Sequence, residues 1–150
     1  MIIAEKNYLR DGRAPVPKNV VTSKVMSANR AKNTKPESTL RKALCEGGIR
    51  GYRLNWKKAP GRPDIAFPGK KIAIFVHGCF WHRCPSCNPH LPQSNSEFWS
   101  KKFENNVARD ERNLAQLARM GWQVITVWEC EIKNNLKNAV DNIKNHIFTL

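Results

Sequence analysis

The cysteines constrain the fold of this chain more than any other feature of its sequence. Three of them stand in one polar, proline-containing loop with the spacing C-x4-C-x2-C, and a fourth follows a strand-like segment further along the chain. The four are Cys79, Cys84, Cys87 and Cys130. Structural zinc is held by four such ligands in a tetrahedron. If the strand before Cys130 pairs beside the strand before the loop, both strands end on the same side and the fourth cysteine reaches the other three.

Other ligands remain open within this loop, because His77, His82 and His90 lie nearby and imidazole also binds zinc. The alternative of scattered free cysteines does not account for three of them in a polar loop. With all four ligands supplied by the protein there is no open position, so we expect a structural zinc and not a catalytic one. Cys45 lies apart, inside the first expected helix, and is interpreted as a small apolar packing residue.

The first half of the chain predicts a helix followed by three strands. Thr34 can cap a helix that has a proline and an acid in its first turn and that stops at Gly47-Gly48. A first strand is expected over Tyr52–Leu54. A hairpin follows, with arms over Gly61–Phe67 and Lys71–Val76 joined by a Pro-Gly turn. The second arm is nearly all apolar and β-branched, which predicts a central, buried strand.

The second half predicts a long helix from about Asn95 to Met120, a strand over Trp122–Trp128 and an amphipathic helix from about Asn134. The apolar contacts of the long helix are expected from Phe98, Phe103, Val107, Leu114 and Leu117. The resulting fold class is α/β, a mixed sheet flanked by helices in an α/β sandwich with a structural zinc loop.

One domain is expected over residues 23–150, preceded by a flexible basic arm over residues 1–22. The polar, basic composition continues to about residue 34, and Val21–Arg30 within it has the pattern of a short helix. We interpret the arm as a segment that settles on nucleic acid.

The charge balance predicts a polyanionic partner. The chain has 26 Lys and Arg against 12 Asp and Glu, a formal net charge of +14 and a pI near 10.0. Such an excess favours contact with phosphate backbones, although it does not separate DNA from RNA. A merely soluble basic protein, or one that sits on acidic membranes, is the alternative. No apolar run reaches the roughly 20 residues that a membrane span needs, so we expect a soluble cytoplasmic protein with no membrane partner.

Two acids and two histidines suggest phosphodiester chemistry. Asp64 stands at the head of the hairpin and Glu37 on the first helix, an arrangement familiar in metal-dependent nucleases. Cleavage needs a hard cation on oxygen ligands, and a histidine suits the general base at neutral pH. Pro-Asp alone is also a common turn signal. The histidines His77 and His82 enclose Phe80 and Trp81, two adjacent aromatics that either wedge between base steps or cover the underside of the zinc loop.

At these residues the chain resembles the very-short-patch-repair (Vsr) DNA mismatch endonucleases. The resemblance covers roughly residues 23 to 132, with the motifs in the family's order and at close to its spacing. The matching stretches are Thr34-Lys35-Pro36-Glu37, Pro60-Gly61-Arg62-Pro63-Asp64, His77-Gly78-Cys79-Phe80-Trp81-His82, Glu97-Phe98-Trp99, and Gly121-Trp122-Gln123-Val124 running into Val127-Trp128-Glu129-Cys130.

The resemblance implies a fold like that of type II restriction enzymes and a magnesium-dependent nick 5′ to the mispaired T of a T·G mismatch. Such mismatches arise where 5-methylcytosine has deaminated. The implied partner is double-stranded DNA carrying that mismatch, with mismatch-repair proteins as an open second partner. A monomer in the bacterial cytosol or nucleoid is expected, since one nick needs one active site.

The resemblance also implies roles for individual residues. Asp64 binds magnesium together with the main-chain carbonyl of Val76, and Glu37 orders water on the metal from its helix. His82 acts as general base, with His77 assisting. The aromatic wedge is formed by Phe80, Trp81 and Trp99. The zinc is held by Cys79, Cys84, Cys87 and Cys130.

This sequence departs from the wider nuclease superfamily at one place and from many members of the repair family at another. Ile74-Phe75-Val76 offers neither the acid nor the lysine that the wider nuclease superfamily carries on this strand, which the repair family replaces by histidine. Family members often place a histidine among the zinc ligands, whereas this loop offers a third cysteine. Two rival functions remain: another nuclease of a restriction–modification system with relaxed mismatch choice, and a zinc-dependent DNA-binding module without activity. The trio Asp64, His77 and His82 favours an enzyme over the inert module.

Overall fold

The computed structural model describes residues 34–148 and has the elements expected from the sequence, with one addition. The expected N-terminal arm over residues 1–22 and the short helix over Val21–Arg30 lie outside the described residues. The helices are α2 (Lys35–Glu46), α3 (Ser96–Arg119), α4 (Glu129–Asn134) and α5 (Leu136–Phe148). The strands are β1 (Arg53–Leu54), β2 (Ile65–Phe67), β3 (Ile72–His77) and β4 (Gln123–Trp128).

Helix α2 begins and ends where its sequence signals place the boundaries. The Thr34 hydroxyl accepts a hydrogen bond from the main-chain N–H of Glu37 at 3.4 Å, which satisfies one of the free amides of the first turn. At the other end, the N–H of Gly47 donates to the carbonyl of Ala43 at 3.0 Å. The cap and the stop signal predicted for this helix are both confirmed.

The sheet has the order β1-β2-β3-β4 and is mixed, as predicted. The first three strands are antiparallel neighbours, so the predicted hairpin over β2 and β3 is confirmed. β4 joins β3 in parallel over its whole length, and His77 at the end of β3 lies opposite Trp128 at the end of β4. Because parallel neighbours end on the same side, the segments that follow these two strands leave the sheet next to each other.

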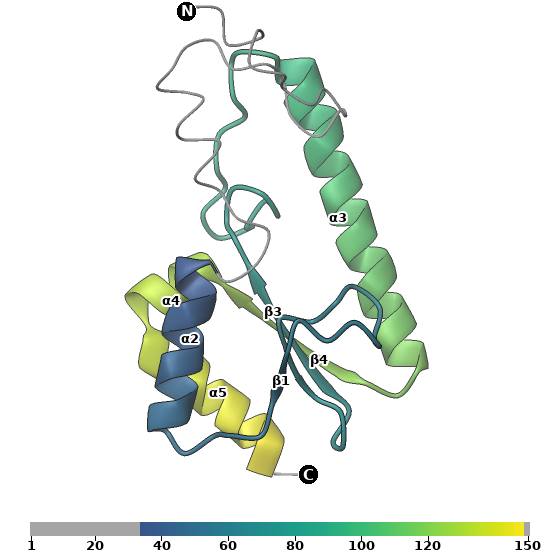
Figure 1. Cartoon of the computed structure of the whole chain (residues 1–150). Helices are drawn as coiled ribbons and strands as arrows, with labels where there is room; N and C mark the ends of the chain where they lie inside the picture. Colours follow the sequence, from purple (N-terminus) through teal and green to yellow (C-terminus); the bar gives the residue numbers. More distant parts are fainter. Residues whose placement is uncertain (1–33, 149–150) are drawn as a thin grey trace, which may run out of the picture.

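Helices cover both faces of the sheet, and Figure 1 shows α3 on one side with α2, α4 and α5 on the other. Side chains alternate along β3, as they must in a strand. Ile72, Ile74 and Val76 belong to the core under α2, α4 and α5, whereas Ala73 and Phe75 belong to the core that includes Leu117 of α3. The predicted α/β sandwich is therefore confirmed, and the alternation places His77 on the α3 face, beside Phe75.

Three expectations from the sequence were wrong in detail. Helix α4 was not predicted, because its six residues show no periodicity of their own and it buries only Ile132. Leu114 was expected to be one of the apolar contact residues of α3 but is 37% exposed. Cys45 was interpreted as an apolar packing residue, yet it is exposed, and its Sγ lies 3.2 Å from the hydroxyl of Tyr52.

No helix within residues 34–148 combines the length and the apolar character needed to cross a membrane.

The central strand generates a stability prediction. Ile74 is fully buried between its neighbouring strands, so we expect Ile74→Ala to lower the free energy of unfolding by about 3 kcal/mol through lost burial and the cavity that remains. Leu54→Ala, at a position 44% exposed, is the matched control and should cost less than about 1 kcal/mol. Urea unfolding of both variants measures the difference, and equal losses would contradict the assignment of β3 to the core.

Candidate active site and metal centre

Three elements bring two histidines and an acid together at the end of β3. His77 is the last residue of β3 and is buried, His82 comes from the following loop, and Asp110 comes from α3. The two imidazole rings are stacked, with centroids 3.9 Å apart and planes 4° from parallel. Nδ1 of His82 lies 2.6 Å from Oδ2 of Asp110. The two histidines predicted for the site therefore lie in contact, and Asp110 completes the group.

The hydrogen bond to Asp110 defines which nitrogen of His82 is available for chemistry. Burial alone would raise the pKa of Asp110, but the hydrogen bond and charge of His82, followed by the charges of His77 and Arg109, outweigh it and lower this pKa. An ionised Asp110 accepts the proton of Nδ1, which leaves the lone pair on Nε2 of His82. A histidine oriented in this way by a carboxylate is suited to act as a general base.

His77 is held neutral by its surroundings. Burial, followed by the charge of the adjacent His82, lowers the pKa of His77 to about 4. Trp128 packs against its ring edge-on, with centroids 5.2 Å apart, and Phe75 lies on the same face of β3. His77 thus offers a neutral imidazole beside His82 at neutral pH.

Asp64 lies at the start of β2, against the main chain of β3. Its Oδ2 accepts a hydrogen bond of 2.7 Å from the N–H of Val76. Burial raises the pKa of Asp64 to about 6, the hydrogen bond from Val76 opposes this, and the charge of Glu37 adds to the rise. Glu37 itself is 4% exposed, and its Oε2 lies 4.0 Å from the guanidinium of Arg41. The structure therefore brings the buried Glu37 and the half-buried Asp64 close enough to interact, and their negative charges are unfavourable unless a cation balances them.

The four predicted cysteines meet in one cluster. Their Sγ atoms all lie within 4.8 Å of one another, and Sγ of Cys84 is 3.8 Å from Sγ of Cys130. Four thiolates in a tetrahedron around zinc, each at about 2.3 Å, are separated by about 3.8 Å. The cluster therefore has the composition and the size of a site for a metal such as zinc, and the histidines do not compete for it. His90 is exposed and lies outside both clusters found in residues 34–148.

Main-chain amides support the cluster. The amides of Cys87 and Ser86 donate to the thiol of Cys84 and lower its pKa against the opposing effect of burial. Burial raises the pKa of the Cys79 thiol to about 12. A bound metal ion would replace the thiol proton of Cys79 and favour the thiolate, because cysteine binds metals as a thiolate. Glu129, in the first turn of α4, accepts from the N–H of Cys79 at 3.4 Å and so joins α4 to the loop.

The aromatic residues of the loop pack against α3. Phe80 lies edge-on to Trp81, Trp99 and Phe103, with ring centroids 5.1 to 5.7 Å apart. Trp81 also contacts Trp99, at 5.6 Å. Trp99 is 9% exposed, whereas Phe80 and Trp81 are only half-buried. The three predicted wedge residues therefore form one cluster, in which Trp99 is the buried support.

Sequence reasoning missed two polar residues on α3. Asp110 orients His82, and the Asn106 side chain donates to the carbonyl of Trp81 at 3.1 Å. A signal for both was present in the sequence. They continue the helical stripe of Trp99 and Phe103 at intervals of three and four residues, where apolar residues are expected. A buried polar residue on such a stripe needs a partner, which here is the histidine loop.

Comparisons with known proteins agree with this site. The family model described as DNA mismatch endonuclease Vsr matches residues 17–88. The type II nicking enzyme V.XorIIP of Xanthomonas oryzae is 44% identical over 123 residues, 78% of this chain and 90% of that protein. The type II nicking enzyme V.NaeI of Lentzea aerocolonigenes is 40% identical over 141 residues, which are 91% of this chain and 84% of that protein. The DNA mismatch endonuclease Vsr of Escherichia coli is 36% identical over 124 residues, which are 83% of this chain and 79% of that protein.

A mixed sheet with a histidine–acid cluster at the end of its central strand, together with these relatives, defines an endonuclease of the restriction-enzyme-like class. Within that class, the chain belongs to the Vsr family of DNA mismatch endonucleases.

The raised pKa of the half-buried Asp64 generates a prediction about pH. Because its pKa in the folded protein, about 6, exceeds the ordinary value of 3.8, the native state holds this proton more tightly than the unfolded chain does. The resulting stabilisation is complete below pH 3.8 and is lost as the pH rises through 6. Asp64→Asn, which keeps a carbonyl oxygen for the N–H of Val76, should abolish this loss. From pH 5 to pH 8, wild type should lose about 1.4 kcal/mol relative to the variant.

Urea unfolding without added divalent cations measures this difference. The comparison between the two proteins cancels the contributions of His77 and the cysteines, which both contain. Parallel pH profiles would show that Asp64 is ionised in the folded protein as easily as in the unfolded chain.

Proposed function

We propose that this chain nicks one strand of duplex DNA 5′ to the mispaired T of a T·G mismatch by magnesium-dependent hydrolysis. The observation that carries the proposal is the group at the end of β3, where a carboxylate-oriented histidine stacks on a neutral histidine and lies close enough to Asp64 to affect its pKa. Three relatives bear names that specify mismatch or nicking endonuclease activity, which supports strand nicking over an inert DNA-binding module.

Asp64 and the main-chain carbonyl of Val76 are the proposed magnesium ligands. The fit rests on the donor set, because Asp64 offers a carboxylate oxygen, lies against the main chain of Val76 and is penalised for ionising without a neighbouring positive charge. A magnesium ion there would neutralise the charge that develops on the scissile phosphate. Glu37, close enough to Asp64 to affect its pKa, would orient water from its helix.

His82 is the proposed general base. With its Nδ1 proton directed at Asp110, Nε2 of His82 can remove a proton from the attacking water. His77 assists because its neutral ring stacks on His82 and interacts with the imidazolium that forms without adding a second positive charge. Asp110 positions His82. Because the pKa of Asp110 is lowered in this environment, its side chain is an anion that interacts favourably with a protonated base.

Phe80, Trp81 and Trp99 are the proposed wedge beside the mismatch. Two of the rings are half-buried and rest on the buried Trp99, so an exposed edge remains to insert between base pairs. A mispair unstacks at lower cost than a Watson–Crick pair, which favours opening at the T·G site.

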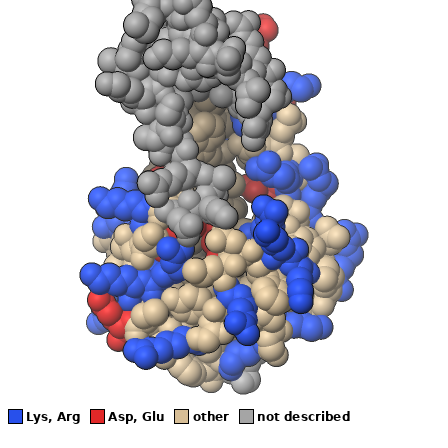
Figure 2. Space-filling model, viewed as in Figure 1, with Lys and Arg blue, Asp and Glu red and all other residues tan. Residues whose placement is uncertain are grey.

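The surface charge fits a DNA substrate. Figure 2 shows lysine and arginine side chains distributed over the visible face of the molecule, with few acidic side chains between them. With the net charge of +14, this favours binding to the phosphate backbone. We further propose one nuclease domain over residues 23–150, with residues 1–22 as a basic arm on the DNA, that acts as a monomer.

The first test compares nicking of a labelled duplex with one T·G mismatch and of its fully paired twin. With magnesium, we expect a nick 5′ to the mispaired T and no nick in the twin. His82→Ala should slow nicking by roughly 10² to 10⁴-fold, the usual contribution of a general base. Asp64→Asn should abolish it, while Asp141→Asn, at an exposed position on α5, serves as the matched control and should cut normally.

Equal cutting of both duplexes would retain a nuclease but reject the mismatch specificity. Binding without cutting, in wild type and control alike, would favour the inert module.

The second test concerns zinc. We expect one zinc ion per chain in the purified protein, held by Cys79, Cys84, Cys87 and Cys130. Cys84→Ser should lower the zinc content to near zero and the melting temperature by roughly 10 °C or more, because metal binding contributes to folding free energy. Cys45→Ser changes an exposed cysteine outside the cluster and should alter neither value. Full zinc content in Cys84→Ser, measured by atomic absorption, would contradict the assignment.

A further inference from the structure

Arg83 stands between the proposed general base His82 and the cluster residue Cys84, and its side chain turns inward. Its guanidinium donates to the carbonyl of Phe80 at 3.4 Å and to the carbonyl of Pro89. It also lies over the ring of Phe103 on α3, 4.2 Å from the centroid, and 5.8 Å from the centroid of Phe80. Four contacts from one side chain therefore join two parts of the loop to each other and to the long helix.

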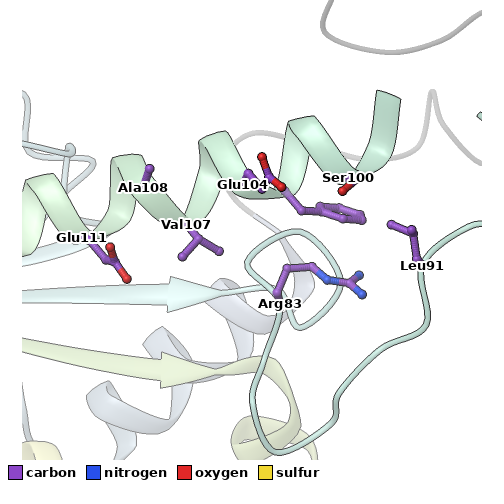
Figure 3. A pocket seen from close by; sticks show the side chains of 8 residues that line it. Arg83, Leu91, Ser100, Glu104, Val107, Ala108 and Glu111 are labelled. Atoms are coloured by element: carbon purple, nitrogen blue, oxygen red, sulfur yellow. The ribbon is translucent and has the colours of Figure 1, made fainter. Parts of the chain in front are cut away.

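The direction of this side chain is unusual for a basic residue in a DNA-cutting loop. Figure 3 shows Arg83 reaching from the loop into the space beneath α3, toward Leu91. It lines a cavity of about 470 Å³ together with Glu104, Glu111 and apolar residues of the helix. An arginine that served only to attract phosphate would extend into solvent, whereas this one is half-buried among carbonyls, aromatic rings and acids.

The two carbonyls that Arg83 contacts flank Cys84 and Cys87, whereas Cys79 precedes both carbonyls. Phe80 precedes Cys84 and Pro89 follows Cys87, so the planar guanidinium spans the cysteine-bearing segment from outside the cysteine cluster. A guanidinium can hold two acceptors in fixed directions and stack on an aromatic face at the same time, which an ammonium group cannot do. The cysteines join the loop to Cys130 beyond β4, and Arg83 joins it to α3 on the other side.

Short main-chain hydrogen bonds transmit this attachment to the reacting groups. The N–H of His82 donates to the carbonyl of Gly78 at 3.1 Å, and the N–H of Cys84 donates to the carbonyl of Cys79 at 3.0 Å. Residues 78–84 are therefore tied into one coiled segment, and we expect a displacement of the Phe80 carbonyl to displace His82 as well. A displacement of a reacting group by about 1 Å is enough to reduce the rate of the catalysed reaction by about 10²-fold.

We propose that Arg83 is a positioning residue that holds Phe80 and His82 in their working positions, independently of the metal at the cysteines. This inference rests on the proposed nicking function, for which Phe80 belongs to the wedge and His82 is the base. It assigns a role to a residue that contacts the carbonyls of Phe80 and Pro89 and the rings of Phe80 and Phe103.

The test uses Arg83→Met and Arg83→Lys, with Arg112→Met as the matched control for a lost charge on an exposed position of α3. Methionine keeps the aliphatic stem over Phe103 but neither hydrogen bond. Lysine keeps the charge and reaches only one carbonyl. The substrate is the T·G duplex with 2-aminopurine beside the mismatch, whose fluorescence rises when the base unstacks. Zinc content, duplex affinity and the single-turnover nicking rate are measured on the same samples.

We expect Arg83→Met to retain its zinc and to bind the duplex within about threefold of wild type, yet to nick about 10 to 100-fold more slowly, with a reduced 2-aminopurine signal. Arg83→Lys should recover only part of the rate, and Arg112→Met should match wild type in rate and signal. A fall in affinity alone, or full recovery by lysine, would overturn the proposal, because charge and not geometry would then be responsible.

A measurement without DNA separates this inference from the proposed function. Hydrogen exchange of loop residues 79–91 should be faster in both Arg83 variants than in wild type, whether or not the protein nicks T·G duplexes. If wild type does not nick while exchange rises as expected, the proposed function fails and the attachment by Arg83 stands. Unchanged exchange in both variants overturns the attachment. If Arg83→Met loses its zinc on folding, Arg83→Lys decides the question by the same readouts.

Discussion

The parallel pairing of β3 with β4 is the interaction on which the rest of this structure depends. It is the single parallel contact in the described sheet, and it ends with His77 opposite Trp128. Both strands therefore deliver their following residues to one end of the sheet, where the loop after β3 meets the first turn of α4. Without this pairing, Cys130 could not reach the other cysteines, and Trp128 could not pack against His77. The cysteine cluster and the histidine pair are thus two results of one strand arrangement.

The loop after β3 has almost no regular structure, so its position is set by attachments on two sides. On the β4 side are the cysteine cluster and the hydrogen bond from Cys79 to Glu129. On the α3 side, Asn106 holds the Trp81 carbonyl and Asp110 holds His82, one helical turn apart. An irregular segment loses much conformational entropy when it is ordered, which explains why several independent contacts act on so few residues. In the function that we propose, this ordering keeps the general base and the aromatic wedge on one segment.

Several charged or titratable groups of the site destabilise the folded chain. The half-buried Asp64 lies near the buried Glu37, and desolvation is the main reason that the pKa of Asp64 rises to about 6. His77 is disfavoured as a cation by burial and by its neighbour His82. Functional sites commonly contain such perturbed groups, because the arrangement that serves the substrate or a metal is unfavourable without them. In contrast, Asp110 is stabilised as an anion by the histidines around it.

The sequence by itself determined the local structure and the inventory of chemical groups. The Thr34 cap, the hairpin and the alternation along β3 follow from rules that act over a few residues, and the cysteine spacing predicted the cluster of four cysteines that the structure shows. The tertiary structure alone decided which groups meet. Asp110 belongs to the site only because one face of α3 packs over the end of β3, and its distance in sequence from His82 hid that contact. Helix α4 and the exposed position of Cys45 likewise depend on packing, since six residues carry no period and a cysteine suits either environment.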